Sequence, residues 1–501
     1  MATKTKGVVL VIMDGWGLAP ASKTNGVSVG KTPHYDKYMK EYPHARLKAD
    51  GESVGLPVGQ MGTSEVNHLT IGAGRVIYQD LVKINKEIET EAIFENEVLV
   101  EALEKAKANK VKLHLIGLLS DGGVHSHIDH FKALLQMSKK HDLNKVFVHA
   151  FTDGRDTLAT SGKKYIAELE REMKALNTGK LATLVGRYFA MDRDHNWERT
   201  DKAYDLLVSN NGKEFSSAKA AIEESYELGI TDEFVEPAVI NSAGDSKIEE
   251  GDVVIFVNFR IDRPRQLTER FIQKGPETHF VTMTRYNPLY AVKVAYPPTE
   301  LSNSLGEFLS EAGIKQLRVT ETEKFAHLTF FLNCKREEAY EGEDRIMFDS
   351  YSDIPTHDHR PEMRAADVAG QVVEAIEKGT HQVIFTNICN PDMVGHTGNF
   401  PAIVKAVEAT DDAIGKIVSA AKKHHYDVII TADHGNAEET VDEKTGEPKT
   451  SHSLNPVPCI FVSESYKKLN KKDGTLIDLA PTIIEMLGLK TPPEMEGESL
   501  V

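Results

Sequence analysis

The fold class is set near the N-terminus by the stretch VVLVIMDG at positions 8–15. Its consecutive apolar residues predict a strand that is buried on both faces, because a half-exposed strand would alternate apolar and polar side chains. The run is too short for a membrane span or a signal-peptide core. Asp14 and Gly15 follow it directly, so an acidic side chain stands at the carboxyl end of a predicted central strand.

Similar apolar runs recur along the chain, at Val111–Leu119, Lys145–Phe151, Leu181–Val185, Val253–Val257, Val383–Thr386, Val428–Thr431 and Pro458–Val462. Helix-like segments such as Ala366–Lys378 and Ala402–Lys422 separate them. Buried strands that alternate with helices predict parallel sheets covered by helices on both faces. We therefore predict an α/β fold throughout.

The 501 residues are too many for one ordinary hydrophobic core, so more than one domain is expected. One candidate linker follows Gly72–Gly74, near Tyr78, and the other surrounds Tyr296–Pro298, where paired prolines favour an extended connection. Cutting there predicts a domain formed by residues 1–77 and 299–501, with a second domain, residues 78–298, inserted into it.

Composition narrows the class of partner. Lys and Arg number 59 against 76 Asp and Glu, a net charge of −17, which disfavours binding to nucleic acid or to an anionic membrane. The three cysteines form no Cys-x-x-Cys pair, which fits a reducing cytosol. We expect a cytoplasmic monomer with a small-molecule partner.

Acidic and imidazole side chains follow three of the predicted strands. Asp14 ends the first, Asp392 and His396 follow Val383–Thr386, and Asp433-His434 follows Val428–Thr431. Ligands of parallel sheets bind outside the carboxyl ends of the strands. Asp392 and His396, four residues apart, would share one face of a helical turn. A metal site and a set of ordinary turn or helix-cap residues are both consistent with this pattern.

The glycine-rich stretch GQMGTSEVNH at positions 59–68 contains a candidate nucleophile, Ser64. At a helix start its hydroxyl would lie near unpaired backbone N–H groups. The alternative is a plain N-cap serine. Because serine needs a base or a metal for activation and no Gly-x-Ser-x-Gly motif is present, metal activation is the simpler mechanism.

Together with Ser451-His452-Ser453, these motifs resemble the alkaline-phosphatase superfamily and, more narrowly, the 2,3-bisphosphoglycerate-independent phosphoglycerate mutases. The resemblance runs in family order over the whole chain, through positions 14–17, 59–68, 390–398 and 433–436. Thr63 and Thr70 stand where asparagine is usual, and Asn67 where glycine is usual. None of these three residues is an expected ligand, so the departures concern loop geometry and the position of the serine.

The resemblance implies an alkaline-phosphatase-like core that carries an inserted substrate-binding domain, and two Mn²⁺ ions per chain. One ion would be held by Asp392, His396 and His452. The other would be held by Asp14, Ser64, Asp433 and His434. Oxygen and nitrogen ligands without a thiolate also allow Zn²⁺ or Co²⁺.

The resemblance further implies the interconversion of 3-phosphoglycerate and 2-phosphoglycerate, in glycolysis or gluconeogenesis, through a phosphoserine on Ser64. Lys324 would stabilise the transferring group and Asp156 would shuttle a proton. The implied substrate-binding residues are His125, Arg155, Asp156, Arg187, Arg193, Arg260, Arg263 and Lys324. Arginine suits oxyanions because its planar fork pairs bidentately with them, although most arginines are surface residues. Closure of the two domains is expected to exclude water.

Three other functions are weighed against this one. A metal-dependent phosphomonoesterase could use the same core. A sugar-phosphate mutase such as phosphopentomutase would use a threonine nucleophile and a different insert. A non-catalytic scaffold would not need the nucleophile, the ligands and the arginines together.

Overall fold

The strand β1 (Gly7–Met13) lies inside the first of two mixed sheets in the computed structural model, which describes residues 5–298, 301–442 and 444–501. Among these residues the sheet has eight strands in the order β12-β11-β13-β1-β14-β15-β2-β16. The other strands of this sheet are β2 (His44–Lys48), β11 (Gln316–Glu321), β12 (Glu343–Phe348), β13 (Val383–Ile388), β14 (Tyr426–Thr431), β15 (Val457–Val462) and β16 (Asp473–Thr475).

All seven residues of β1 are buried, as the uninterrupted apolar run predicts. The strand pairs in parallel with β13 on one side and with β14 on the other. The strand β15, in contrast, is antiparallel to β14 and to β2. This differs from the parallel arrangement expected from the sequence. The chain returns from β14 to β15 through a loop without a crossover helix, and such a connection reverses the strand direction.

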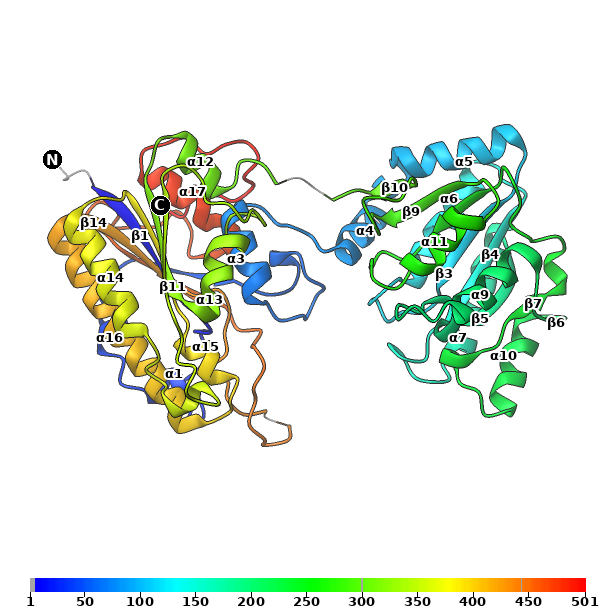
Figure 1. The fold of residues 1–501 in the computed structure, drawn as a ribbon. Helices are drawn as coiled ribbons and strands as arrows, with labels where there is room; N and C mark the ends of the chain where they lie inside the picture. The colour runs from blue at the N-terminus through cyan, green and yellow to red at the C-terminus, as the bar shows by residue number, and fades with distance from the viewer. Residues whose placement is uncertain (1–4, 299–300, 443) are drawn as a thin grey trace. The chain divides into compact units, whose positions relative to one another are not determined.

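Helices cover both faces of this sheet, as Figure 1 shows. On one face α14 (Ala365–Lys378) packs against α16 (Phe400–His424), and α16 also contacts α2 (Pro33–Glu41). On the other face α3 (Ser64–Ala73) contacts α12 (Leu305–Glu311) and α17 (Leu479–Met486). The shorter helices are α1 (Gly26–Val29), α13 (Thr322–Ala326) and α15 (Asn390–Gly395).

The second sheet has eight strands among the described residues, in the order β10-β9-β8-β3-β4-β5-β7-β6. Its strands are β3 (Leu113–Leu118), β4 (Val146–Thr152), β5 (Lys180–Gly186), β6 (Lys213–Phe215), β7 (Ala238–Ile240), β8 (Val253–Phe256), β9 (His279–Thr284) and β10 (Lys293–Tyr296). Every pairing is parallel except that of β5 with β7. The α/β class with parallel-rich sheets is therefore confirmed.

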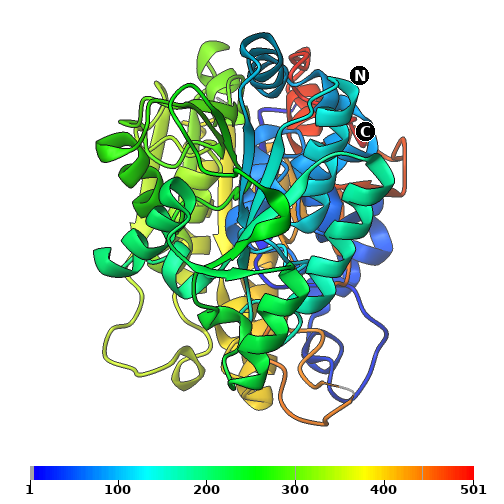
Figure 2. The same cartoon turned by 90° about the vertical axis from the view of Figure 1, so that its right-hand side faces the viewer.

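Alternate residues of β3 divide the second core into two layers. Leu113 and Leu115 belong to one apolar cluster, and Ile116 and Leu118 to the other. The first cluster includes side chains of α5 (Glu97–Asn109), α6 (Ile128–Lys140), α7 (Gly162–Leu176) and α10 (Ala218–Glu227). The second includes α8 (Arg187–Ala190), α9 (Trp197–Ser209) and α11 (Arg265–Lys274). The helices lie on both faces of the sheet (Figures 1 and 2), and α4 (Asp80–Glu89) precedes them in sequence.

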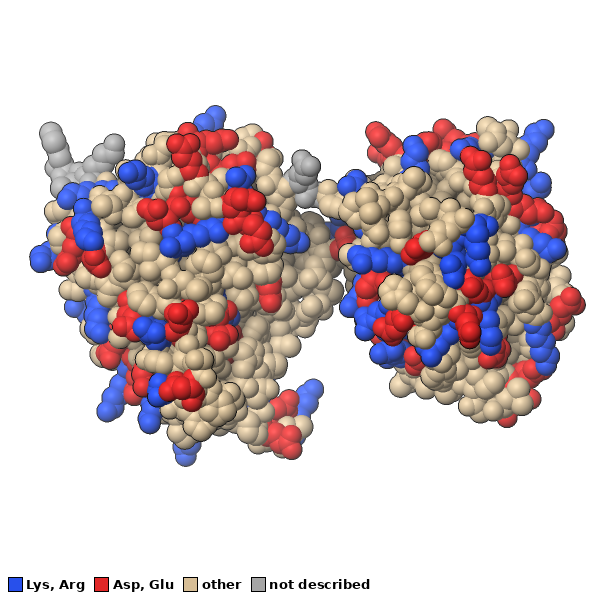
Figure 3. Space-filling model, viewed as in Figure 1, with Lys and Arg blue, Asp and Glu red and all other residues tan. Residues whose placement is uncertain are grey.

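Contacts between residues divide the chain into two units. Unit 1 comprises Met1–Tyr78 with Glu300–Val501, and unit 2 comprises Gln79–Thr299. The sequence predicts the second boundary between residues 298 and 299. Residue 299 lies outside the described residues. On the face drawn in Figure 3, acidic and basic side chains intermix on both units. Within the described part of the chain, no helix has both the length and the apolar character that crossing a bilayer requires.

A buried histidine in unit 2 makes its stability depend on pH. His130 on α6 is fully buried, its Nε2 lies 2.9 Å from Asn85 Oδ1, and burial lowers its pKa to about 3. Between that value and the unfolded pKa of about 6.5, only the unfolded chain takes up the proton, so acidification removes stability. We expect His130 to contribute a loss of about 2 kcal/mol between pH 6.5 and pH 5.

The variant His130→Gln should lose correspondingly less stability over the same interval. Urea unfolding at both pH values measures this in a Trp16→Phe background, where Trp197 of unit 2 is the remaining tryptophan. Equal losses for the parent and the variant would show that His130 does not cause the dependence.

Candidate metal centre and oxyanion cluster

The metal ligands predicted in unit 1 converge because three neighbouring strands end at the same edge of the sheet. The strands β13, β1 and β14 are adjacent and parallel, with Met13 opposite Ile388 and Ile12 opposite Thr431. Asp14 follows β1, Asp392 lies in α15 just after β13, and Asp433 follows β14. All three carboxylates are at most 1% exposed. Buried carboxylates without cationic partners would be unstable, so the site must supply positive charge.

Ser64 and Lys324 lie among these carboxylates. The Nζ of Lys324 donates to Ser64 Oγ at 2.6 Å, to Asp14 Oδ1 at 2.8 Å and to Asp392 Oδ2 at 2.7 Å. On its other side, Ser64 Oγ lies 2.9 Å from His434 Nε2. The serine is 4% exposed and the lysine 3%. The hydroxyl thus lies between a cation and an imidazole, in surroundings that suit a nucleophile.

Three histidines present the same ring nitrogen to the site. His396 Nδ1 lies 2.7 Å from Thr450 O, and His452 Nδ1 lies 2.8 Å from Gly62 O. A carbonyl oxygen can only accept, so each Nδ1 carries a hydrogen and each ring turns its Nε2 toward the site. Both Nε2 atoms approach Asp392 Oδ1, at 3.2 and 3.1 Å. The third, His434, directs Nε2 toward Ser64, Asp14 and Asp433.

These donors fit two divalent cations. Two groups of side chains, Asp392-His434-His452 and Asp14-Asp433-His434, bring their ligand atoms within 4.8 Å of one another. His396 adds a nitrogen 3.3 Å from His452 Nε2. Asp433 Oδ2 is buried without a hydrogen-bond partner, as expected of an atom reserved for a metal. Histidines whose second nitrogen is held by a carbonyl are the usual arrangement at metal sites.

A third group of possible ligands has a different explanation. His34, Asp411 and Asp412 also cluster. The two carboxylate oxygens of Asp411, however, accept the backbone N–H groups of His34 at 3.1 Å and Tyr35 at 2.7 Å, in the first turn of α2. Asp411 therefore satisfies unpaired donors of a helix end, and no metal is needed to explain it.

The charges at the centre shift one another's pKa values. Burial, and then the neighbouring Asp433, raise the pKa of Asp14. Burial opposes the charge of Lys324, but Asp14, Asp392 and Asp433 outweigh it and hold the lysine pKa well above its usual range. Burial likewise opposes ionisation of Asp392, yet Lys324, His396 and His452 bring the pKa of Asp392 well below normal. The structure thus favours a charged lysine beside an ionised Asp392.

The helix that carries Ser64 begins in an unexpected way. Thr63 is the N-cap, and its side chain accepts the N–H of Val66, so Ser64 is the first helical residue. The alternative that Ser64 itself is an N-cap serine is therefore wrong. Thr70 bonds within the helix, to Val66 O at 2.8 Å.

Of the three unusual positions noted in the sequence, Asn67 makes bonds outside its own helix. Its Nδ2 donates to Ala49 O at 2.9 Å and to Asp433 O at 2.6 Å, so it joins the Ser64 helix to the loop that bears Asp433 and His434. Replacing Asn67 by glycine should destabilise unit 1 by roughly 2–4 kcal/mol. Two buried carbonyl groups would lose their donor, and a helical position would gain a glycine.

Urea unfolding followed by Trp16 fluorescence, in a Trp197→Phe background, measures this loss. The matched control is Thr70→Ala, which removes one bond inside the same helix and should cost only about 1 kcal/mol. An Asn67→Gly variant as stable as its parent would contradict the bridging role of Asn67.

The substrate-binding residues predicted in unit 2 also gather at the carboxyl ends of adjacent strands, in the order β8-β3-β4-β5. Arg187 begins α8 after β5, and its Nη1 donates to Asp156 Oδ2 at 2.5 Å and to Asp153 Oδ1 at 2.7 Å. His125 follows β3, and its Nε2 lies 3.8 Å from Asp156. Arg187 and His125 are almost fully buried, which is costly unless a ligand or partner compensates.

Two of the other predicted arginines, Arg193 and Arg260, contact Asp262, which follows β8, whereas Arg155 Nη1 lies 3.6 Å from Glu233 Oε1. Arg193 Nη1 donates to one oxygen of Asp262 at 2.8 Å, and Arg260 Nε to the other at 3.0 Å. Arg263 bonds to Met191 O, and burial together with Arg187, Arg193 and Arg155 lowers its pKa. Such mutual repulsion among guanidinium groups favours the binding of an anion.

His125 supports the same conclusion. Burial, followed by the charge of Arg187, lowers its pKa to about 4, so the imidazole is neutral at physiological pH. Its Nδ1 is buried without a hydrogen-bond partner. A neutral, buried and unpaired ring nitrogen beside several arginines is suited to a hydrogen bond with a bound ligand.

Two positioning residues of this cluster were not predicted. Asp153 is 1% exposed and accepts Ser120 Oγ at 2.6 Å and the backbone N–H groups of Arg155 and Asp156, in addition to Arg187. Asp262 orients two arginines that are half exposed. Both belong to short motifs already noted for their arginines, Asp153-Gly154-Arg155-Asp156 and Arg260-Ile261-Asp262-Arg263. In both motifs, the sequence signal that could have identified these residues was a carboxylate close to an arginine.

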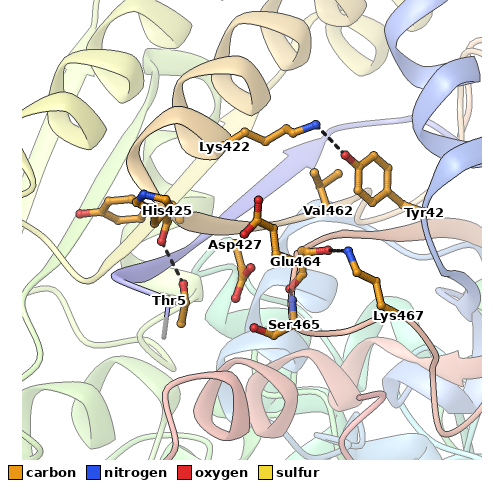
Figure 4. A pocket seen from close by; sticks show the side chains of 11 residues that line it. Thr5, Tyr42, Lys422, His425, Asp427, Val462, Glu464, Ser465 and Lys467 are labelled. Carbon is orange, nitrogen blue, oxygen red and sulfur yellow. Dashed lines mark hydrogen bonds between the residues drawn. The ribbon is translucent and has the colours of Figure 1, made fainter. Parts of the chain in front are cut away.

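A cavity of about 190 Å³ lies in unit 1 at the other edge of the first sheet, around the amino end of β14. Figure 4 shows Lys422, Asp427, Glu464 and Lys467 around it, with Lys422 Nζ donating to the hydroxyl of Tyr42 at 2.9 Å. None of the predicted site residues lines this cavity.

Two family models match parts of the chain. Residues 84–288 match the family model "BPG-independent PGAM N-terminus", and residues 277–457 match "Type I phosphodiesterase / nucleotide pyrophosphatase". The chain is 47% identical over 508 residues to a 2,3-bisphosphoglycerate-independent phosphoglycerate mutase of Clostridium perfringens, covering 99% of both chains. The enzyme of that name from Moorella thermoacetica is also 47% identical, over 99% of this chain and 98% of the relative.

A solved structure is similar over the same extent. The phosphoglycerate mutase of Leishmania mexicana, crystallised at low cobalt concentration, is 30% identical to this chain, with a TM-score of 0.55. The alignment covers 99% of this chain and 98% of that one.

Proposed function

The chain belongs to the 2,3-bisphosphoglycerate-independent phosphoglycerate mutases, and we propose that it carries out their reaction with Ser64 as the nucleophile of a two-metal centre. As a member of this family it is an isomerase that interconverts 3-phosphoglycerate and 2-phosphoglycerate. The observation that carries our assignment of Ser64 is its position: a buried hydroxyl 2.6 Å from Lys324 Nζ and 2.9 Å from His434 Nε2.

The division of the ligands between two ions follows the family resemblance, and the chemistry of the donors supports it. Asp392, His396 and His452 would hold one divalent ion, and Asp14, Ser64, Asp433 and His434 the other. Bound ions would lower the pKa of the serine hydroxyl and offset the charge of the phosphoryl oxygens. The absence of thiolates and the mixture of carboxylate and imidazole support Mn²⁺, with Zn²⁺ and Co²⁺ as alternatives.

The side chains of unit 1 then account for the transfer. Ser64 Oγ attacks the phosphorus of 3-phosphoglycerate, the bond from phosphorus to the substrate oxygen breaks, and phosphoserine forms. Lys324, held between Asp14 and Asp392, donates to an oxygen of the transferring group and stabilises its charge. In the return step the other hydroxyl of glycerate attacks the phosphoserine, and Ser64 becomes the leaving group.

The side chains of unit 2 retain the glycerate between these steps. A phosphoglycerate carries about three negative charges near pH 7, so binding requires several cations. Arg155, Arg187, Arg193, Arg260 and Arg263 supply them, and His125 offers a neutral hydrogen-bonding nitrogen. Asp156 is the proposed proton carrier between the two oxygens of glycerate: the oxygen that leaves in the first step gains a proton, and the hydroxyl that attacks in the return step gives one up to Asp156. Its contact with Arg187 holds it in this cluster.

The division of labour between the domains follows from these roles. Residues 1–77 and 299–501 would form the metal-binding domain, and residues 78–298 the substrate-binding domain. A cytoplasmic location and a monomeric state remain predictions from the sequence.

A coupled assay tests the proposal. Purified enzyme, freed of metal and reloaded with Mn²⁺, is mixed with 3-phosphoglycerate in the absence of bisphosphoglycerate, and 2-phosphoglycerate is detected through enolase. We expect rapid formation of 2-phosphoglycerate that requires added metal. Release of inorganic phosphate in place of 2-phosphoglycerate would favour a phosphomonoesterase on the same core, and full activity in the metal-free enzyme would refute the two-metal centre.

A further inference from the structure

A buried carboxylate outside the predicted metal ligands connects the loops that carry them. Glu438 is 3% exposed. Its Oε2 accepts the backbone N–H of Gly17 at 2.9 Å and that of Asn436 at 2.9 Å. Its Oε1 accepts Asn455 Nδ2 at 3.0 Å and the hydroxyl of Ser453. One side chain therefore satisfies four donors from three stretches of the chain.

Each of these donors lies close in sequence to predicted metal ligands. Gly17 is three residues beyond Asp14, Asn436 is two beyond His434, and Ser453 follows His452. Asn436 extends the network further, because its Nδ2 donates to Asp392 Oδ1 at 3.0 Å. Glu438 is thus linked to the loops of both predicted metal sites, although it belongs to neither set of ligands.

Two glycines allow this close approach. A Cβ added at Gly17 or at Gly435 would lie 2.3 Å from Glu438 Oε1. The backbone therefore surrounds the carboxylate so tightly that neither position accepts a side chain without displacement. Backbone bonds join the same loops, from Ala437 N to Gly15 O and from Ser453 N to Gly435 O, both at 3.0 Å.

The chemistry of the partners requires an acid at this position. Gly17, Asn436 and Asn455 can only donate through the groups that point at Glu438, and Ser453 donates its hydroxyl. A carboxylate accepts all four bonds, whereas the NH₂ group of a glutamine amide would face either the two backbone N–H groups or Asn455 Nδ2, none of which can accept. Buried donors left without an acceptor are costly, so the loops would shift to regain one.

We propose that Glu438 is a positioning residue for metal binding: it fixes the loops after β1, after β14 and before β15 so that the ligands of both ions stand in place. The inference rests on the metal ligands assigned under the proposed function. Partners that orient the ligands of a metal typically contribute a factor of about 10 to 100 in metal affinity.

The test compares Glu438→Gln with a control acid of similar burial. Asp478 is also 3% exposed, and it accepts the backbone N–H groups of Thr475 and Glu498, each at 2.8 Å, away from the metal centre. Mn²⁺ is titrated into the metal-free parent, Glu438→Gln and Asp478→Asn, and the free ion is measured by electron paramagnetic resonance. Circular dichroism and thermal unfolding of the metal-free proteins report the fold.

We expect Glu438→Gln to bind both ions about 10- to 100-fold more weakly than the parent, and Asp478→Asn to lose thermal stability while its metal affinity is unchanged. Equal affinity in Glu438→Gln and the parent would overturn the inference and leave the proposed function intact. A parent that fails to bind two ions would instead overturn the proposed function.

A second variant keeps the inference testable if Glu438→Gln does not fold. Ser453→Ala removes one of the four donors and should weaken metal binding about fivefold, the effect of one lost hydrogen bond. The parent should then bind Mn²⁺ more tightly than Ser453→Ala does. Identical affinities of these two proteins would count against the inference.

Discussion

Replacing Ser64 by alanine is expected to abolish phosphoryl transfer between the two positions of glycerate. Loss of a covalent nucleophile lowers turnover by roughly 10⁴-fold or more, because the remaining groups cannot form the intermediate. The loss should appear in kcat, while KM changes little, since the substrate-binding arginines of unit 2 are untouched. Single-turnover and steady-state assays with 3-phosphoglycerate measure both constants.

The neighbouring threonine provides the control for this variant. Thr63 caps the same helix through its hydroxyl, so Thr63→Ala costs about 1 kcal/mol of helix stability but leaves the nucleophile. Thr63→Ala should therefore keep most of the activity. A Ser64→Ala enzyme that retains turnover within tenfold of the parent would show that another residue accepts the phosphoryl group.

Replacing Lys324 by methionine is expected to lower kcat by about 10²- to 10³-fold. Removing one preorganised donor to a developing charge usually costs this much. In the structure the ammonium group binds Ser64 Oγ and two carboxylates, and methionine keeps most of the length of the side chain without the charge. Rapid-quench measurement of phosphoserine formation would locate the defect in the transfer step.

A lysine of unit 2 offers a matched comparison. Lys112 is also buried and pairs with Glu249 at 2.6 Å, but it lies outside both predicted sites. Lys112→Met should affect stability and leave kcat nearly unchanged. If Lys324→Met turned over within a few-fold of the parent, the role of the lysine in transition-state stabilisation would be wrong.

The sequence predicted the strands well, because buried parallel strands have a strong local signature. The apolar runs at positions 8–13, 383–386 and 428–431 all lie in β1, β13 and β14, the strands that bring the predicted ligands together. The direction of β15 could not be predicted in the same way. Its residues are as apolar as those of a parallel strand, and its orientation depends on the loop that precedes it.

The candidate site was predictable where a residue type and a strand end coincide, as at Asp14, Asp392 and Asp433. The supporting residues were not. Glu438, Asp153 and Asp262 act by accepting hydrogen bonds from loops or arginines that only the folded chain brings near them. Asn67 shows the same limit: the sequence identified it as a departure, and the structure shows its bonds to Ala49 and Asp433.

The central claim is that Ser64 carries the phosphoryl group during the reaction, and phosphopeptide mapping tests it most directly. The Mn²⁺-loaded enzyme is mixed with 3-phosphoglycerate, quenched in acid within milliseconds, digested and analysed by mass spectrometry. We predict one phosphate on Ser64, formed and consumed as fast as the enzyme turns over. Phosphate on a different residue, or steady turnover without phosphate on Ser64, would contradict the mechanism.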